Sequence, residues 1–497
     1  MYASGETLEA IKKLGIELKL DFILNHASVL SKQFQDIIAK GEESEYKDFF
    51  INWNEFWKDC GEMTEQGYIL PEEKYLKKMF FRKPGLPILM VRFPDGREIP
   101  YWNTFYQEVN YPKVSAQELM KAADLQYMQA EIIAQGLSMG CPEGKKPADI
   151  LQEIVLERKA GRLTKEQITT IWNYMEQHRY YLGQMDLNIQ SPKVWEFYRE
   201  TLEKIASYGA AIVRLDAFAY APKTPGKKNF LNDPETWELL QKIHALAEPL
   251  GLTLLPEIHA AYDEKIYQTL AEKGYATYDF FLPGLVIDAI ENRRGTYLAA
   301  WAKEIVEKKI STVNMLGCHD GIPLLDLKGL LPKEEIQSLI DRIVSRGGMV
   351  KNLHGQKNLY YQVNATYYSA LGESDEKMLL ARAIQMFMPG KPQIWYLDLF
   401  AGKNDHEAVQ RAGESGHKEI NRTNLSVDQI AEGLKKDVVQ KQLALIRMRN
   451  THKAFSEGAE VTISGEESSL EIRWEYDGAY VELHVNFEEG TYTIESN

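Results

Sequence analysis

The segment AAIVRLDAFAYAPKT, residues 210–224, decides the fold class because it joins an apolar run to charged residues. Its first residues are apolar or small, as in a strand of a parallel sheet that is buried on both faces. Arg214 and Asp216 follow two residues apart, so their side chains lie on one face of an extended chain. An ion pair at the end of a buried strand is either a satisfied structural pair or part of a reactive site.

Further apolar runs alternate with helical patterns, which is typical of βα units around a parallel sheet. Each of two expected helices, 191–209 and 233–251, starts with Ser or Asp and ends with Gly. The strands are expected within residues 18–26, 210–220, 253–260, 277–283, 312–320 and 391–400. The pattern predicts an α/β fold with a (β/α)8 TIM-type barrel.

Polar residues collect where four of these runs end. They are Asn25 and His26, Arg214 and Asp216, Glu257 and His259, and His319 and Asp320. Barrel enzymes carry their active sites at the C-terminal ends of the strands. Four polar strand ends in register are hard to explain as separate buried pairs, so we expect one active site there.

Three parts of the chain are expected. The catalytic barrel takes 1–26 and 181–449. The inserted domain, 27–180, follows the third strand and has a helical extension at 115–180. Alternating runs in 450–497 predict a small antiparallel β domain.

The start of the chain is short for a complete barrel. Only 25 residues precede His26, and one helix accounts for part of them, so six barrel strands are counted in place of eight. Six strands would leave two open edges with unpaired backbone. We therefore expect a barrel that lacks its first two strands, through a truncated gene model or a fragment of a longer gene.

Composition narrows the class of partner. The net charge of −14 argues against nucleic acid and anionic membranes, although a local pocket can still bind a small anion. Three cysteines make neither a disulfide framework nor a metal-site spacing, which favours reduced thiols in the cytoplasm. There is no run of 18 apolar residues that would predict a membrane span, and no signal peptide.

Carboxylates on neighbouring strands suggest glycoside chemistry, in which one attacks the anomeric carbon and the other protonates the leaving oxygen. The motifs VRLDAFAY, LLPEIHA and LGCHDG, with LNH before them, resemble the α-amylase superfamily, glycoside hydrolase family 13, over nearly the whole chain. The segments 32–50, 82–87, 360–372, 393–405 and 418–424 resemble its sucrose phosphorylase subfamily. That group comprises phosphorylases of sucrose, sucrose 6-phosphate, glucosylglycerol and glucosylglycerate.

The resemblance implies a retaining cleavage of an α-glucoside by phosphate, giving α-glucose 1-phosphate. It implies Asp216 as nucleophile, Glu257 as general acid/base and Asp320 as the third carboxylate. It also implies sugar-binding roles for His26, His319 and Arg422. We expect Arg214 to hold Asp216 ionised, and partial burial to raise the pKa of Glu257 toward a value useful for proton donation.

Phosphate must replace water as the attacking group, which calls for charge-assisted donors on the acceptor side. The family's acceptor loops match Arg82 or Lys83, with Tyr361 and Gln362. Taken alone, the Arg-Lys pair also fits two solvated side chains on a loop. Members that use sucrose 6-phosphate tend to have histidine at the position of Tyr361, so the tyrosine favours an unphosphorylated acceptor. No metal or organic cofactor is expected, and inorganic phosphate is the co-substrate.

Several alternatives stay open. The same residues fit an α-glucosidase or transglucosidase, and the short start fits an inactive truncated barrel. The helical stretch 115–180 is extra relative to compact members; it reshapes acceptor choice, covers the barrel mouth, mediates dimer contacts or is a solvated addition. The acceptor and the oligomeric state, with a homodimer among the options, are left undecided.

Overall fold

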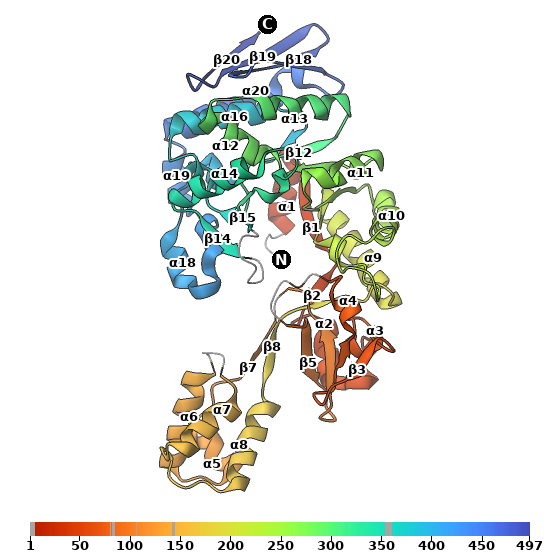
Figure 1. Cartoon of the computed structure of the whole chain (residues 1–497), viewed down its shortest axis with the longest axis vertical. Helices are drawn as coiled ribbons and strands as arrows, with labels where there is room; N and C mark the ends of the chain where they lie inside the picture. The colour runs from red at the N-terminus through yellow and green to blue at the C-terminus, as the bar shows by residue number, and fades with distance from the viewer. Residues whose placement is uncertain (1–4, 80, 82–84, 106, 142–144, 353–359) are drawn as a thin grey trace. The chain divides into compact units, whose positions relative to one another are not determined.

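The structure is a computed structural model that describes residues 5–79, 81, 85–105, 107–141, 145–352 and 360–497. The chain divides into two compact units (Figure 1). Unit 1 comprises Met1–Phe22, Thr201–Phe218 and Trp237–Asn497, and unit 2 comprises Ile23–Glu200 and Ala219–Thr236. Among the described residues, no helix has the length and apolar character that crossing a membrane requires.

Six short strands of unit 1 form two three-stranded sheets. The first sheet has the order β1 (Leu18–Ile23), β9 (Ala210–Asp216), β10 (Thr253–Pro256), and the second β11 (Thr277–Asp279), β12 (Thr312–Asn314), β16 (Lys391–Pro392). The pairs β9–β10, β11–β12 and β12–β16 are parallel. All six strands lie within the six segments that the sequence predicts.

Helices of unit 1 supply most of its hydrophobic core. Nearly all of α12 is buried, and Trp301 of α13 donates its indole N–H to Asp279 at the end of β11, 3.0 Å away. The helices are α1 (Gly5–Lys13), α10 (Glu235–Ala247), α11 (Ile266–Glu272), α12 (Leu282–Asn292), α13 (Thr296–Glu307), α14 (Lys333–Ser345), α15 (Tyr367–Ala370), α16 (Asp375–Phe387), α17 (Tyr396–Leu399), α18 (His406–Ala412), α19 (Val427–Gly433) and α20 (Asp437–Thr451). The helix α9 (Pro192–Ser207) runs from unit 2 into unit 1.

Two antiparallel sheets complete unit 1. The sheet after β12 has the order β13 (Ile322–Pro323), β15 (Tyr360–Asn364), β14 (Met349–Asn352), and the C-terminal sheet β17 (Glu460–Ser464), β18 (Ser469–Tyr476), β19 (Ala479–Asn486), β20 (Thr491–Ser496). Trp474 of β18 donates to the carbonyl of Phe387 at the end of α16, 2.7 Å away. The C-terminal sheet shares a core with α16 and lies in unit 1.

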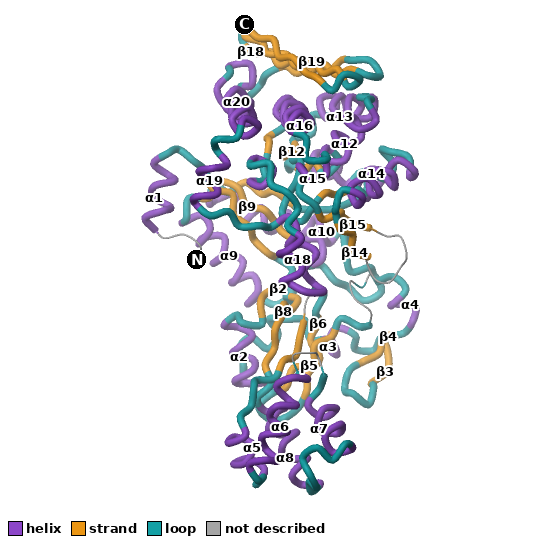
Figure 2. Tube along the Cα trace, turned by 90° about the vertical axis from the view of Figure 1, so that its left-hand side faces the viewer, coloured by secondary structure: helices purple, strands orange, loops and turns teal. Residues whose placement is uncertain are grey.

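Unit 2 is built from short sheets and small helices. Its sheets are β2 (His26–Ser28), β8 (Tyr180–Asp186), β7 (Gln107–Asn110); β3 (Gly61–Met63), β4 (Ile69–Pro71); and β5 (Ile88–Arg92), β6 (Glu98–Trp102). Its helices are α2 (Lys32–Lys40), α3 (Trp53–Phe56), α4 (Glu73–Leu76), α5 (Ala116–Ala123), α6 (Tyr127–Gly140), α7 (Pro147–Leu156) and α8 (Lys165–Gln177). Figure 2 shows α5–α8 gathered together, and they share a hydrophobic core of their own.

The boundaries predicted at 26/27 and 180/181 differ from those of the structure. The strand β8 pairs antiparallel with β2 and β7, and unit 2 extends to residue 200. Residues 219–236 also belong to unit 2. Local patterns gave no sign of these pairings, because the partners lie far apart in the sequence.

Candidate active site

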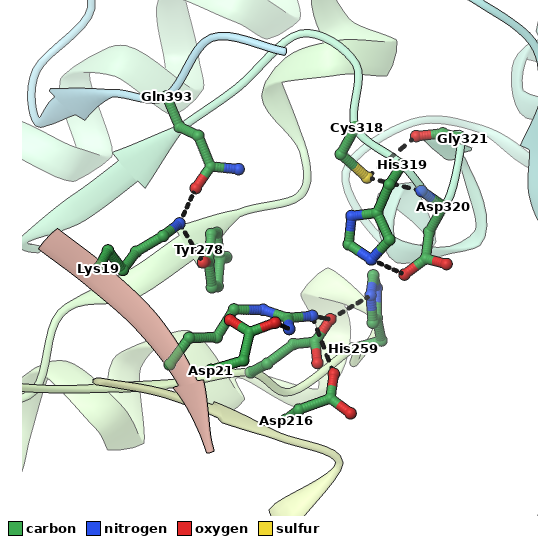
Figure 3. A network of polar contacts seen from close by, with 12 residues as sticks. Lys19, Asp21, Asp216, His259, Tyr278, Cys318, His319, Asp320, Gly321 and Gln393 are labelled. Atoms are coloured by element: carbon green, nitrogen blue, oxygen red, sulfur yellow. Dashed lines mark hydrogen bonds and ion pairs between the residues drawn. The ribbon is translucent and has the colours of Figure 1, made fainter. Parts of the chain in front are cut away.

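Arg214 connects three carboxylates at the end of β9. Its Nη2 lies 3.0 Å from Oδ1 of Asp216 and 2.7 Å from Oε1 of Glu257, and its Nη1 lies 2.9 Å from Oδ2 of Asp21. The parallel pairing of β9 with β10 explains the geometry: the backbone N–H of Glu257 donates to Leu215, 3.2 Å away, so residue 257 follows the last paired position. The Arg214–Asp216 ion pair expected from the sequence is thus part of a cluster of three carboxylates around Arg214 (Figure 3).

Asp216 and Glu257 share the positive charge of one guanidinium. Burial and the neighbouring Glu257 raise the pKa of Asp216 to about 7, although Arg214 opposes the shift. Burial also acts to raise the pKa of Glu257, but the interaction with His259 and the charge of Arg214 outweigh it and lower that pKa. Both pKa shifts run opposite to the sequence-based expectations, because the sequence did not show how the charges around Glu257 are placed.

His259 lies between two carboxylates. Its Nδ1 is 3.3 Å from Oδ1 of Asp326 and its Nε2 is 3.7 Å from Oε1 of Glu257. The ring stacks on Phe280, with ring centroids 3.8 Å apart and planes inclined by 18°. Burial alone would lower the pKa of His259, but Asp326 and Glu257 raise it to about 9.

Asp320 is held by basic side chains from the segment before α19. Lys418 Nζ lies 2.7 Å and Arg422 Nη2 3.2 Å from its Oδ1, and His319 Nε2 lies 3.2 Å from its Oδ2. Burial acts to raise the pKa of Asp320, but Lys418 and His319 outweigh it and lower that pKa. Arg422 also donates from Nε to the carbonyl of His319, 2.9 Å away.

A steric constraint explains why the last residue of the LGCHDG motif, Gly321, is a glycine. At Gly321 the backbone has φ of 107°, and a Cβ there would lie 2.5 Å from the carbonyl oxygen of Val363 on β15. The side chain of Asn364 donates to the carbonyl of Asp320, 2.8 Å away. The close approach of β15 therefore fixes the backbone that carries Asp320.

His26 belongs to unit 2, where a second buried polar cluster surrounds Lys223. Lys223 Nζ lies 2.7 Å from Oδ2 of Asp186 and 3.1 Å from Oδ1 of Asn25, and it also donates to the carbonyl of Tyr220. Asn25 Nδ2 is 3.4 Å from Nδ1 of His26. This cluster fixes the residue that precedes His26.

The acceptor-side predictions fall partly outside the described residues. Gln362 lies on β15 opposite Pro323 and is half-buried, and Tyr361 lies in the same strand. Arg82 and Lys83 lie outside the described residues. Of the two segments expected on the acceptor side, the one with Tyr361 and Gln362 thus lies on β15, whose Asn364 contacts the backbone of Asp320.

Three residues of the site were not singled out from sequence. Lys418 stands inside the 418–424 motif that matched the family, so the motif was the available signal. His259 was noted as a polar strand end but given no role. Asp326 lies 67 residues from His259, and no local pattern connects them.

One group of residues in the described part of the chain has ligand atoms close enough to hold a metal ion: Glu471, Glu482 and His484 on β18 and β19. None of the predicted catalytic residues belongs to it. Glu482 is also ion-paired with Arg473, 3.1 Å away, which competes with a metal for that carboxylate.

Comparisons with known proteins find relatives over nearly the whole chain. The chain is 47% identical over 501 residues to the sucrose 6(F)-phosphate phosphorylase of Ilumatobacter coccineus, covering 99% of this chain and 84% of that protein. It is 30% identical to the sucrose phosphorylase of Streptococcus mutans, covering 97% of this chain and 82% of that protein. No family model matches.

Solved structures give the same class. The crystal structure of sucrose 6F-phosphate phosphorylase from Thermoanaerobacter thermosaccharolyticum superposes with a TM-score of 0.76 at 31% identity, covering 99% of this chain and 83% of that one. The α-amylase of H. orenii shares the fold at 16% identity and a TM-score of 0.54, covering 97% and 72%. Fold and carboxylate cluster define a barrel enzyme of the α-amylase superfamily. Within it, this chain belongs to the sucrose phosphorylase subfamily of glycoside hydrolase family 13.

Proposed function

We propose that this chain is a retaining phosphorylase that transfers a glucosyl group from an α-glucoside to phosphate by double displacement. Asp216 attacks the anomeric carbon while Glu257 protonates the departing oxygen. Phosphate then attacks the glucosyl ester of Asp216, Glu257 accepts a proton, and α-glucose 1-phosphate leaves. The observation that carries the proposal is the contact of Arg214 with both carboxylates.

The spacing of the carboxylates supports retention of configuration. One nitrogen of Arg214 contacts Oδ1 of Asp216 at 3.0 Å and Oε1 of Glu257 at 2.7 Å, so these oxygens are no farther apart than the sum of the two distances. That sum is below the roughly 6.5 Å at which the range for inverting enzymes begins, and it accommodates the ~5–5.5 Å typical of retaining ones.

Asp320 supports the sugar in this proposal. Lys418 and Arg422 keep its carboxylate ionised, so it accepts hydrogen bonds from two glucosyl hydroxyls and stabilises the positive charge of the transition state. His319, on the same loop, donates to a hydroxyl of the same glucosyl group. We propose the same role for His26.

Sucrose 6F-phosphate is the proposed substrate. The support is the 47% identity to a phosphorylase of that name, together with the relative in T. thermosaccharolyticum at 31%. Sucrose is the second candidate, favoured by Tyr361, where relatives that use sucrose 6-phosphate tend to have histidine. We propose that Arg82 or Lys83, with Gln362, binds the acceptor or the attacking phosphate.

No metal or organic cofactor enters the proposed steps, because Arg214, Lys418 and Arg422 supply the positive charge around the carboxylates. We also propose a cytoplasmic location, in agreement with three free cysteines. A homodimer is proposed as the oligomeric state, to be tested by sedimentation.

The test runs the reaction in reverse and forward. The purified chain is given α-glucose 1-phosphate with fructose 6-phosphate, fructose, glycerol or glycerate, and phosphate release is measured. We expect release with fructose 6-phosphate, none with Asp216→Asn, and phosphate-dependent cleavage of sucrose 6F-phosphate. Cleavage at the same rate without phosphate would indicate a hydrolase, and preference for fructose would select the second substrate.

A further inference from the structure

The loop after β10 places His259 where its two ring nitrogens face two different carboxylates. Nδ1 faces Oδ1 of Asp326 at 3.3 Å and Nε2 faces Oε1 of Glu257 at 3.7 Å. The ring plane is fixed by its stacking on Phe280. Two of the groups that set the orientation of His259, Asp326 and Phe280, thus lie outside the carboxylate cluster around Arg214.

Asp326 depends on His259 for compensation of its charge. It lies on the short helix η5 (Leu325–Leu327), is 3% exposed, and its Oδ2 has no hydrogen-bond partner among the described residues. A buried carboxylate is costly unless it is paired, so Asp326 favours a proton on Nδ1 of His259. With Nδ1 protonated, Nε2 is the nitrogen whose proton is exchangeable with Glu257.

We propose that Asp326 and His259 form a positioning pair that controls the protonation of Glu257, the general acid/base of the proposed reaction. The pair has two states that differ by one proton. In the first, the imidazolium forms an ion pair with the Glu257 carboxylate, with Nε2 3.7 Å from Oε1. In the second, the Nε2–H bond has broken, its electron pair stays on nitrogen, and the proton is on Oε1 of Glu257. The second state presents a protonated acid to the leaving oxygen.

Other titratable groups act on Glu257, and they are the same in both protonation states of the His259–Glu257 pair. They are Arg214 and Asp216 on β9, Lys19 on β1, Tyr278 on β11, and Cys318, His319 and Asp320 after β12. Among these described neighbours, Arg214 is the cation in direct contact with Glu257, and it does not release a proton. Among the described side chains that form ion pairs with Glu257, His259 is therefore the one able to exchange a proton with it.

The first test is independent of turnover. Histidine labelled with 13C at Cε1 is incorporated into the full chain, and the ring signals are titrated by NMR. The signal of His259 is assigned as the one that is lost in His259→Gln or that shifts in Asp326→Asn. We expect His259 to remain an imidazolium above pH 8 and to titrate at lower pH in Asp326→Asn. A neutral His259 at pH 7 in the wild type overturns the proposal.

The second test measures the pH dependence of kcat/KM for phosphate release, and it rests on the proposed function. His259→Gln removes the group that keeps the exchangeable proton up to a pH above 8, so the alkaline limb, which reports the loss of that proton, should move down by about 1 pH unit or more. Asp326→Glu keeps the carboxylate and should retain the alkaline limb of the wild type. His406→Gln, at an exposed histidine of α18, is the control and should leave that limb in place. An unmoved limb in His259→Gln, with lowered activity, would mean a merely structural role. An inactive wild type would refute the proposed function, while the NMR titration still decides the pair.

Discussion

The side chains of Arg214 and Glu257 meet across two neighbouring strands, with Nη2 of the arginine 2.7 Å from Oε1 of the glutamate. The same nitrogen contacts Asp216 on its own strand, at 3.0 Å. One buried cation therefore sets the spacing of the two carboxylates that the proposed mechanism needs. Its loss affects both partners at once.

Arg214→Lys tests the geometric part of that role. An ammonium is a point charge that lacks the guanidinium fork, so it cannot hold Asp21, Asp216 and Glu257 in their present positions. We expect activity to fall by about 100-fold, the cost of a small misplacement in a catalytic site. Phosphate release is the measurement, and unchanged circular dichroism is the control for folding. Wild-type activity in this variant would show that the positive charge alone is sufficient.

Lys418→Met tests the support of Asp320. Lys418 lowers the pKa of Asp320 against the effect of burial, so its removal raises that pKa. Because the proposed reaction needs Asp320 ionised, the acid limb of kcat/KM should move to higher pH, by about 1 unit. Lys403→Met, at an exposed lysine paired with Glu373, is the matched control and should leave the limb in place.

Lys223→Met probes unit 2. Lys223 and Asp186 are both buried and lie 2.7 Å apart, so the variant leaves an uncompensated carboxylate. Breaking a buried pair in this way costs about 3–5 kcal/mol. We expect a corresponding loss in the free energy of unfolding, measured by urea denaturation. Lys40→Met, which removes an exposed ion pair with Asp36, should change it little. Equal effects of the two substitutions would contradict the buried role.

Glu291 gives a prediction for acid stability. Three cations surround it, Arg342, Arg346 and Lys377, at 2.7–2.9 Å. Burial acts to raise the pKa of Glu291, but hydrogen bonds from these cations lower it to about 2. Its folded pKa is below the unfolded value, so its contribution is present at neutral pH and is lost progressively between pH ~4.3 and about 2. The stability difference between wild type and Glu291→Gln should therefore shrink as pH falls from 5 to about 3. A constant difference over that range would show that ionisation of Glu291 contributes nothing.

The sequence predicted much of this arrangement because its signals are local. Apolar runs that end in polar residues identified β9, β10 and β12, and the motifs at their ends predicted that Asp216, Glu257 and Asp320 would converge. The comparisons confirm the fold class and the family.

What the sequence did not predict depends on contacts between distant residues. Asp326 and His259 are 67 residues apart and meet only in the fold, and the direction of the pKa shift of Glu257 follows from that meeting. The pairing of β8 with β2, which places Asp186 beside Lys223, is likewise set by tertiary structure.

The most direct test of the central claim is to trap the glucosyl group on Asp216. Glu257→Gln is mixed with α-glucosyl fluoride, whose departure needs no acid, in the absence of phosphate, and the peptide containing residues 210–224 is analysed by mass spectrometry. The account predicts one added glucosyl unit on Asp216, which added phosphate releases as α-glucose 1-phosphate. A glucosyl unit on another residue, or fluoride release by this variant with inverted product and no adduct, would contradict it.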